Sequence, residues 1–183
     1  MQIFINTLTL SRIISAPIIF ICIAHWQYFG IAILLFVLAS ISDFFDGFLA
    51  RHYQLTSELG KILDPISDKI LIVFGLIGIA LYLESFYVAI TTSFILAREL
   101  WVSALRELNA INSNSKATDV SFLAKIKTTI QFISIAGYIL GLYMNLSFLV
   151  FLSNFILFLA LLITLITGFE YTKNSFGLLA PKE

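Results

Sequence analysis

The stretch that decides the fold runs from Asp43 to Asp68, with D-F-F-D-G-F-L-A-R over 43–51 and G-K-I-L-D-P-I-S-D over 60–68. Four carboxylates stand here between two strongly apolar segments. An ionised aspartate at the centre of a membrane helix costs about 2.5–3.5 kcal/mol, so four of them need bound cations or a water-lined cavity. We therefore expect the rest of the chain to be a scaffold around this site.

The composition indicates an integral membrane protein. Of the 183 residues 60% are hydrophobic and 12% are charged, and the mean hydropathy is +0.99. A soluble domain carries about 25% charged residues. Lys and Arg balance Asp and Glu at 11 each, so net charge gives no sign of a nucleic-acid partner. The one cysteine, Cys22, excludes an intramolecular disulfide and is typical of a buried apolar position.

Long charge-free runs predict six membrane-spanning helices. No Asp, Glu, Lys or Arg occurs in the 30 residues of 13–42 or in the 42 residues of 128–169, and one span needs about 20 residues. A short lead over 1–7, polar connections over 52–60 and 109–119, and a mobile polar tail from Lys173 are expected outside the helices. The predicted helices, in one domain over 1–183, are 8–25, 28–51, 61–83, 86–108, 122–144 and 148–171.

The distribution of cations predicts the orientation. All 11 Lys and Arg residues fall at or toward one end of the predicted bundle, and the connections after the first, third and fifth helices contain none. Cytoplasmic loops are the ones that carry excess Lys and Arg. We therefore expect a multi-pass protein with both termini and the aspartate cluster on the cytoplasmic side.

The aspartates share one face on each of the two helices that carry them. Spacings of three, four and seven residues place side chains on the same side of a helix. The second helix descends to the cytoplasm and the third climbs back, so their faces meet in a cleft that opens to the cytoplasmic side. The positions on these faces are Asp43, Asp46, Gly47 and Ala50 on the second helix, and Gly60, Asp64 and Asp68 on the third.

Several functions fit this cluster. Oxygen ligands without His or Cys suit Mg²⁺ or Mn²⁺, and carboxylates shared by two ions are typical of phosphoryl-transfer sites. Small residues at 47, 50 and 60 leave room for a nucleotide, and Arg51 is a phosphate or base partner. A divalent-cation or proton-coupled transporter also uses intramembrane carboxylates. A structural bundle would pair the aspartates with Arg51, Lys61 and Lys69. Spacing alone leaves enzyme and transporter open.

The pattern D-x2-D-G-x2-A-R-x8-G-x3-D-x3-D resembles, at every fixed position, the signature of the CDP-alcohol phosphotransferase family. The resemblance implies six transmembrane helices, usually a homodimer, and transfer of a phosphatidyl group from a CDP-linked lipid to an alcohol with release of CMP. It implies that Asp68 completes the second of two Mg²⁺ or Mn²⁺ sites and acts as general base on the acceptor hydroxyl. The other implied metal ligands are Asp43, Asp46 and Asp64, and the implied CDP-lipid pocket is Asp46, Gly47, Ala50, Arg51 and Gly60.

A second group of charges bears on the acceptor. Glu99, Ser103 and Arg106 share a face of the predicted fourth helix, and Arg98 sits near its middle, where a cation needs a partner. Lys125 and Lys127 open the fifth helix beside it. Several cations suit an acceptor that carries its own phosphate. The alternative is that they only anchor helix ends on the cytoplasmic side.

These blocks, A-R-E-x4-A-L-R-E at 97–107 and K-x-K-T-x2-Q at 125–131, are similar to the bacterial phosphatidylglycerophosphate synthase branch of the family, as is the N-terminal block at 6–12. The similarity implies CDP-diacylglycerol and sn-glycerol 3-phosphate as substrates, and a bacterial cytoplasmic membrane. Ala124 departs from the glycine often found before the first lysine, which loosens the role of Lys125. Phosphatidylglycerol, inositol phosphate or serine remain alternative acceptors.

Overall fold

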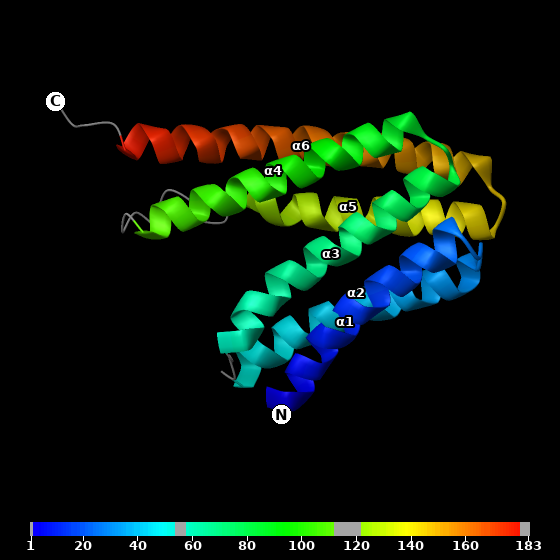
Figure 1. Ribbon diagram of the computed structural model, residues 1–183, viewed down its shortest axis with the longest axis horizontal. Coiled ribbons are helices and arrows are strands. Elements are labelled where there is room, and N and C mark those ends of the chain that lie inside the picture. Colours follow the sequence, from blue (N-terminus) through cyan, green and yellow to red (C-terminus); the bar gives the residue numbers. More distant parts are fainter. Residues whose placement is uncertain (1, 54–57, 112–121, 180–183) are drawn as a thin grey trace.

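The computed structural model describes the backbone of residues 2–53, 58–111 and 122–179. Over these ranges the protein is all-helical (Figure 1). The helices are α1 (Gln2–Ala24), α2 (Phe29–Tyr53), α3 (Glu58–Tyr82), α4 (Phe86–Ile111), α5 (Phe122–Tyr143) and α6 (Ser147–Leu179). The backbone ranges whose side chains are not described are 2–6, 8, 43–53, 58–62, 64–65, 122–125 and 178–179.

The six predicted helices are confirmed, but several predicted ends are wrong. α1 begins at Gln2 rather than 8, so the expected lead is helical, and α2, α3 and α4 extend two or three residues into the expected connections. α6 continues to Leu179, so the tail from Lys173 is helical through that residue. The reason lies in side-chain contacts, since Ser175 is buried and its hydroxyl accepts a hydrogen bond of 2.8 Å from the Asn109 amide of α4.

Two tight turns join neighbouring helices as the sequence predicts. Glu84 and Asn145 adopt left-handed backbone conformations, with φ of 47° and 54°. The next residue in each turn donates its backbone N–H five residues back, from Ser85 to Ala80 at 3.1 Å and from Leu146 to Gly141 at 2.9 Å. This is the Schellman way of ending a helix. The short turns make α3 and α4, and α5 and α6, antiparallel neighbours.

The three hairpin turns lie at one end of the molecule, and the two termini lie toward the other end (Figure 1). The helices form two groups, α1–α3 and α4–α6, which approach each other near the turns and diverge toward the end with the termini. Between the groups, α3 contacts α4 and α5, and α2 contacts α5. A site that uses residues from both groups can therefore lie along α3 or between α2 and α5.

The closest pairing in the first group is between α1 and α3. Buried side chains of both helices, such as Ile19 and Leu76, belong to one apolar core. Phe20 and Phe74 meet edge to face at 5.9 Å between ring centroids, an arrangement that aromatic pairs prefer. Gly78 lies at this contact, where a Cβ would be 3.4 Å from the backbone Cα of Phe20, an ordinary van der Waals distance. α1 is thus fixed along α3.

The surface is that of a membrane protein. Within the described residues, three segments are long and apolar enough to cross a membrane: 86–111, 126–143 and 147–177. The described apolar parts of α1 and α2, at 9–24 and 29–42, are shorter. Large side chains such as Phe148 and Phe169 are more than two-thirds exposed. An apolar surface of this extent is typical of contact with lipid.

Candidate active site

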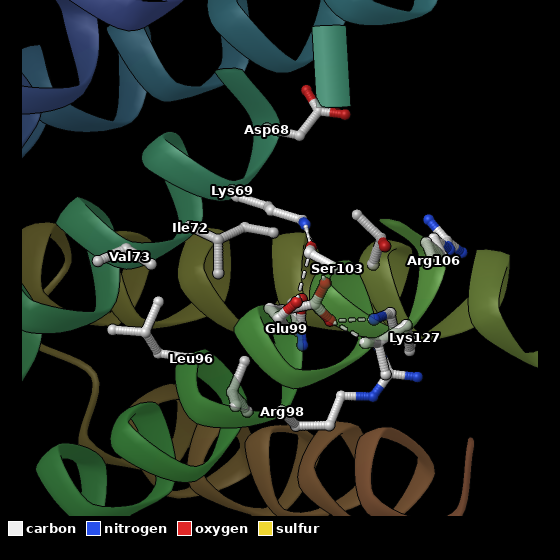
Figure 2. Close-up of a pocket in the computed structure, with 14 residues that line it drawn as sticks. Asp68, Lys69, Ile72, Val73, Leu96, Arg98, Glu99, Ser103, Arg106 and Lys127 are labelled. Atoms are coloured by element: carbon white, nitrogen blue, oxygen red, sulfur yellow. Dashed lines mark hydrogen bonds and ion pairs between the residues drawn. The ribbon is translucent and has the colours of Figure 1, made fainter. Parts of the chain in front are cut away.

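A cavity of about 350 Å³ lies between α3, α4 and α5. One part of its wall is apolar and includes Ile72, Val73, Ile95 and Leu96. The other part is strongly polar (Figure 2). Its polar and charged lining residues are Asp68, Lys69, Arg98, Glu99, Ser103, Arg106, Lys127, Thr128 and Gln131.

Asp68, the predicted catalytic residue, borders this cavity from α3. Its side chain is 26% exposed, and Oδ1 accepts a hydrogen bond from Nη1 of Arg12 at 2.9 Å. Arg12 belongs to α1, and its side chain is fully buried. Sequence reasoning gave Arg12 no role beyond the count of cations, although it ends the N-terminal block at 6–12.

Glu99 forms ion pairs with three of the cations that line the cavity. Its Oε1 accepts hydrogen bonds from Nη1 of Arg98, at 2.9 Å, and from Nζ of Lys127. Its Oε2 lies 3.7 Å from Nζ of Lys69, which also donates to Oγ of Ser103 at 2.8 Å (Figure 2). Lys69 therefore reaches across from α3 to α4, where the structural-bundle alternative paired it with the aspartate cluster.

Arg98 has the polar and aromatic partners that a cation near the middle of a membrane helix needs. Besides Glu99, its Nη2 donates to Oγ1 of Thr167 on α6 at 2.7 Å. Its guanidinium carbon lies 5.6 Å from the centre of the Tyr171 ring, and the guanidinium carbon of Arg106 lies at the same distance. Cations at this distance are attracted to the face of an aromatic ring. One tyrosine of α6 thus contacts both arginines of α4.

Sequence reasoning missed the contribution of α6. The sequence predicts this helix from a charge-free run, but the helix carries a polar face that packs on α4 and α5. Gln131 of α5 lies 3.4 Å from Oγ1 of Thr164, for example. A signal was available in the spacing of three, four and four residues, which places the buried side chains on one face. These are Thr164, Thr167, Tyr171 and Ser175.

The charges of the cavity favour an anion. Among the residues with described side chains, four cations (Lys69, Arg98, Arg106 and Lys127) and two carboxylates line it. One of the two carboxylates, Asp68, is paired with Arg12 from outside this lining. Arg106 has no carboxylate partner within the described part of the chain. Such an excess of cations in a sheltered site attracts a phosphate group.

The remaining predicted site residues lie in helical backbone, and their side chains fall outside the described residues. Helical backbone at 43–51 and 60–68 keeps the spacing on which the predicted faces rest. Among the residues with described side chains no cluster of three potential metal ligands occurs. The roles of these residues stay predictions; the residues are Asp43, Asp46, Gly47, Ala50, Arg51, Gly60, Asp64 and Lys125.

Comparison with known proteins identifies the family. A model described as CDP-alcohol phosphatidyltransferase matches residues 3–166, which run from α1 into α6. The chain belongs to the CDP-alcohol phosphatidyltransferase family. The resemblance carried by the 43–68 motif is thereby confirmed, and the enzyme is favoured over the transporter and the structural bundle.

Individual members of the CDP-alcohol phosphatidyltransferase family are similar over most of the chain. A protein of Rickettsia bellii is 42% identical over 171 residues, which cover 92% of each chain. One of Rickettsia prowazekii is 41% identical over the same shares, and one of Escherichia coli is 36% identical over 140 residues, 74% of this chain and 76% of its own. All three are named CDP-diacylglycerol–glycerol-3-phosphate 3-phosphatidyltransferase.

Proposed function

We propose that the chain transfers the phosphatidyl group of CDP-diacylglycerol to sn-glycerol 3-phosphate, which gives phosphatidylglycerol phosphate and CMP. The observation that carries this proposal is a cavity that Asp68 of the family motif lines together with four cations. The names of the relatives support the choice of substrates. Other alcohols as acceptors are the alternative within the family.

The cations would bind the phosphate of the acceptor. Arg98, Arg106 and Lys127 line the cavity, and Lys125 lies half a turn before Lys127 on α5. The structure adds Lys69, which directly follows Asp68 and reaches Ser103 and Glu99. A phosphate held by these groups would place the hydroxyl end of a three-carbon acceptor toward Asp68. Such positioning converts a bimolecular encounter into an oriented reaction.

The aspartates would hold the metal ions. Asp43, Asp46, Asp64 and Asp68 would form an all-oxygen donor set of the kind that Mg²⁺ and Mn²⁺ prefer. Asp68 is the member whose side chain is described, and it lines the cavity. Two bound ions would supply polarisation of the donor diphosphate. Asp46, Gly47, Ala50, Arg51 and Gly60 would bind the CDP portion.

In the chemical step Asp68 would accept the proton of the 1-hydroxyl of glycerol 3-phosphate. The oxygen forms a bond to the phosphorus on the lipid side, and the bond from that phosphorus to the bridging oxygen breaks. CMP leaves with the electron pair of the broken bond. The acyl chains stay in lipid while the headgroup reaches the site, which explains a bundle with exposed phenylalanines on its surface.

The same proposal includes a bacterial cytoplasmic membrane, six spans, cytoplasmic termini and a cleft between α2 and α3 on the cytoplasmic side. The placement of the hairpin turns at one end of the molecule supports it (Figure 1), since those turns carry no Lys or Arg. We also propose one domain over 1–183, a homodimer, and no nucleic-acid partner.

The test uses purified protein in detergent with CDP-diacylglycerol, Mg²⁺ or Mn²⁺, and a panel of acceptors, and it measures CMP release. We expect release that requires glycerol 3-phosphate and stops on chelation of the metal. Asp68→Asn should lower kcat by about 10²–10⁴-fold, the usual contribution of a general base. Cys22→Ala, a buried change in α1 away from the cavity, is the control and should keep the rate.

Two outcomes would contradict parts of this proposal. Release of CMP with a different alcohol would support the family reaction but contradict glycerol 3-phosphate as the acceptor. No release with any acceptor, from protein that elutes as a folded species, would overturn the proposed activity.

A further inference from the structure

Arg12 is the charged residue of α1 for which the proposed function has no task. Its side chain is fully buried, yet Nη1 lies 2.9 Å from Oδ1 of Asp68, 56 residues away. We propose that Arg12 is a positioning residue that holds the Asp68 carboxylate in the orientation needed for the acceptor hydroxyl. This inference rests on the proposed function, because it concerns how the general base of that reaction is aimed.

The geometry separates the two sides of the carboxyl group. Arg12 approaches Oδ1 from the buried side and is not part of the cavity lining. Asp68 lines the cavity, and its side chain is 26% exposed. Arg12 therefore cannot serve as one more acceptor-phosphate ligand at this cavity. What it can do is fix the rotation of the carboxyl group about its side chain.

The energetics favour a functional role over a stabilising one. Removing a guanidinium from water is costly, and a buried ion pair often stabilises a protein no better than apolar residues of similar size. Arg12 also directs Nη2 toward Oγ1 of the buried Thr9 at 3.5 Å. The block at 6–12 thus contributes two polar side chains to a place where apolar packing would suffice for the fold.

The support for Arg12 is rigid. α1 is held against α3 by a shared apolar core and by the edge-to-face contact of Phe20 with Phe74. Arg12 on one helix and Asp68 on the other are therefore held at a fixed separation. A planar guanidinium binds a carboxylate with defined geometry, whereas an ammonium group acts as a point charge. This makes arginine the suitable residue for alignment.

The experiment compares Arg12→Gln and Arg12→Lys with the wild-type enzyme under the conditions of the CMP assay. A misplaced catalytic group can cost about 100-fold in rate. We expect Arg12→Gln to lower kcat by about that factor, while the KM values for both substrates change less than threefold. Arg12→Lys, which keeps the positive charge but not the planar guanidinium group, should recover part of the lost kcat.

The control for general loosening of α1 is Cys22→Ala, and thermal unfolding is measured for every variant. If Arg12 only ties α1 to α3, Arg12→Gln lowers the melting temperature and leaves kcat per folded molecule intact, which overturns the inference. Should Arg12→Gln not fold, the lysine variant decides: a lowered kcat with unchanged KM supports the inference, and a wild-type kcat refutes it. A wild-type enzyme without activity would instead refute the proposed function.

Discussion

Arg106 and Glu99 show how single residues set the charge of the cavity. Glu99 neutralises part of the charge of Arg98, Lys127 and Lys69. Arg106 is exposed, lies at the cavity mouth on the face of Tyr171, and has no carboxylate partner among the described residues. Its charge is thus available to an incoming anion, and its removal should affect acceptor binding most directly.

We expect Arg106→Gln to raise KM for glycerol 3-phosphate by about 10- to 100-fold, since a hydrogen bond to a charged group contributes about 1.5–3 kcal/mol. KM for CDP-diacylglycerol should stay within about twofold, because the change is on the acceptor side. Steady-state kinetics with each substrate varied in turn would measure both values. The matched control is Lys173→Gln, which removes an exposed charge from the C-terminal part of α6. Equal KM values for wild type and Arg106→Gln would return Arg106 to a role in anchoring α4.

At this scale the sequence predicted which residues matter better than it predicted what they contact. Spacing placed Glu99, Ser103 and Arg106 on one face, and all three line the cavity. The partner of Asp68 was out of reach, because Arg12 lies 56 residues away and nothing local indicates a contact between α1 and α3. Pairing between helices depends on tertiary packing, which periodicity does not encode.

Among the elements, α6 contributes most to the site that the sequence did not reveal. Within its charge-free run lies a polar face, on which Thr167 accepts a hydrogen bond from Arg98 and the ring of Tyr171 contacts the Arg98 guanidinium. Gly168 lies on the same helix, against the side chain of Arg98. A Cβ at this position would come within 2.9 Å of Cγ and 3.1 Å of Nε of Arg98. Arg98 would have to move to relieve this contact. The movement would strain its hydrogen bonds, because its guanidinium group is held by Glu99 and Thr167.

Gly168→Ala should therefore raise KM for glycerol 3-phosphate several-fold and lower the melting temperature, as overpacking typically costs about 1–3 kcal/mol. Gly177→Ala is the matched control, because nothing lies within 4 Å of its added methyl group. Alanine is favoured over glycine in a helix by about 1 kcal/mol, so the control should keep its kinetics and melt no lower than wild type. Thermal unfolding and acceptor kinetics on both variants give the comparison. A Gly168→Ala enzyme indistinguishable from Gly177→Ala would show that Arg98 moves without consequence.

The helix ends illustrate where sequence reasoning stops at the level of elements. Apolar runs place the turns well, because Glu84 and Asn145 interrupt them and adopt the left-handed conformation of helix ends. At the opposite ends the sequence is mixed polar and apolar over 1–7 and polar from Lys173, and this pattern predicts a lead and a tail outside the helices. The continuation of α6 is supported by Ser175, whose buried hydroxyl accepts a hydrogen bond from Asn109 of α4, and that of α1 by Thr9, which accepts one from Arg12 of the same helix.

For the molecule as a whole, the two ends differ in charge and in architecture. The turns 25–28, 83–85 and 144–146 gather at one end and contain no Lys or Arg, whereas the termini lie toward the other end (Figure 1). Such an asymmetry sets orientation in the membrane. In the proposed orientation, the cations that line the cavity lie on the side from which a water-soluble acceptor would arrive.

Thiol labelling would test this orientation. In a Cys22→Ala background, single cysteines are introduced by His25→Cys, Met144→Cys and Lys173→Cys, all at exposed positions. A membrane-impermeant maleimide applied to intact cells should label the first two variants, because their turns face outward, and should label the third only after lysis. Protection of either turn, or labelling at 173 in intact cells, would contradict six spans with cytoplasmic termini. In that event the cavity would open away from the cytoplasm, and a cytoplasmic acceptor could not reach Asp68 by the route that the charges suggest.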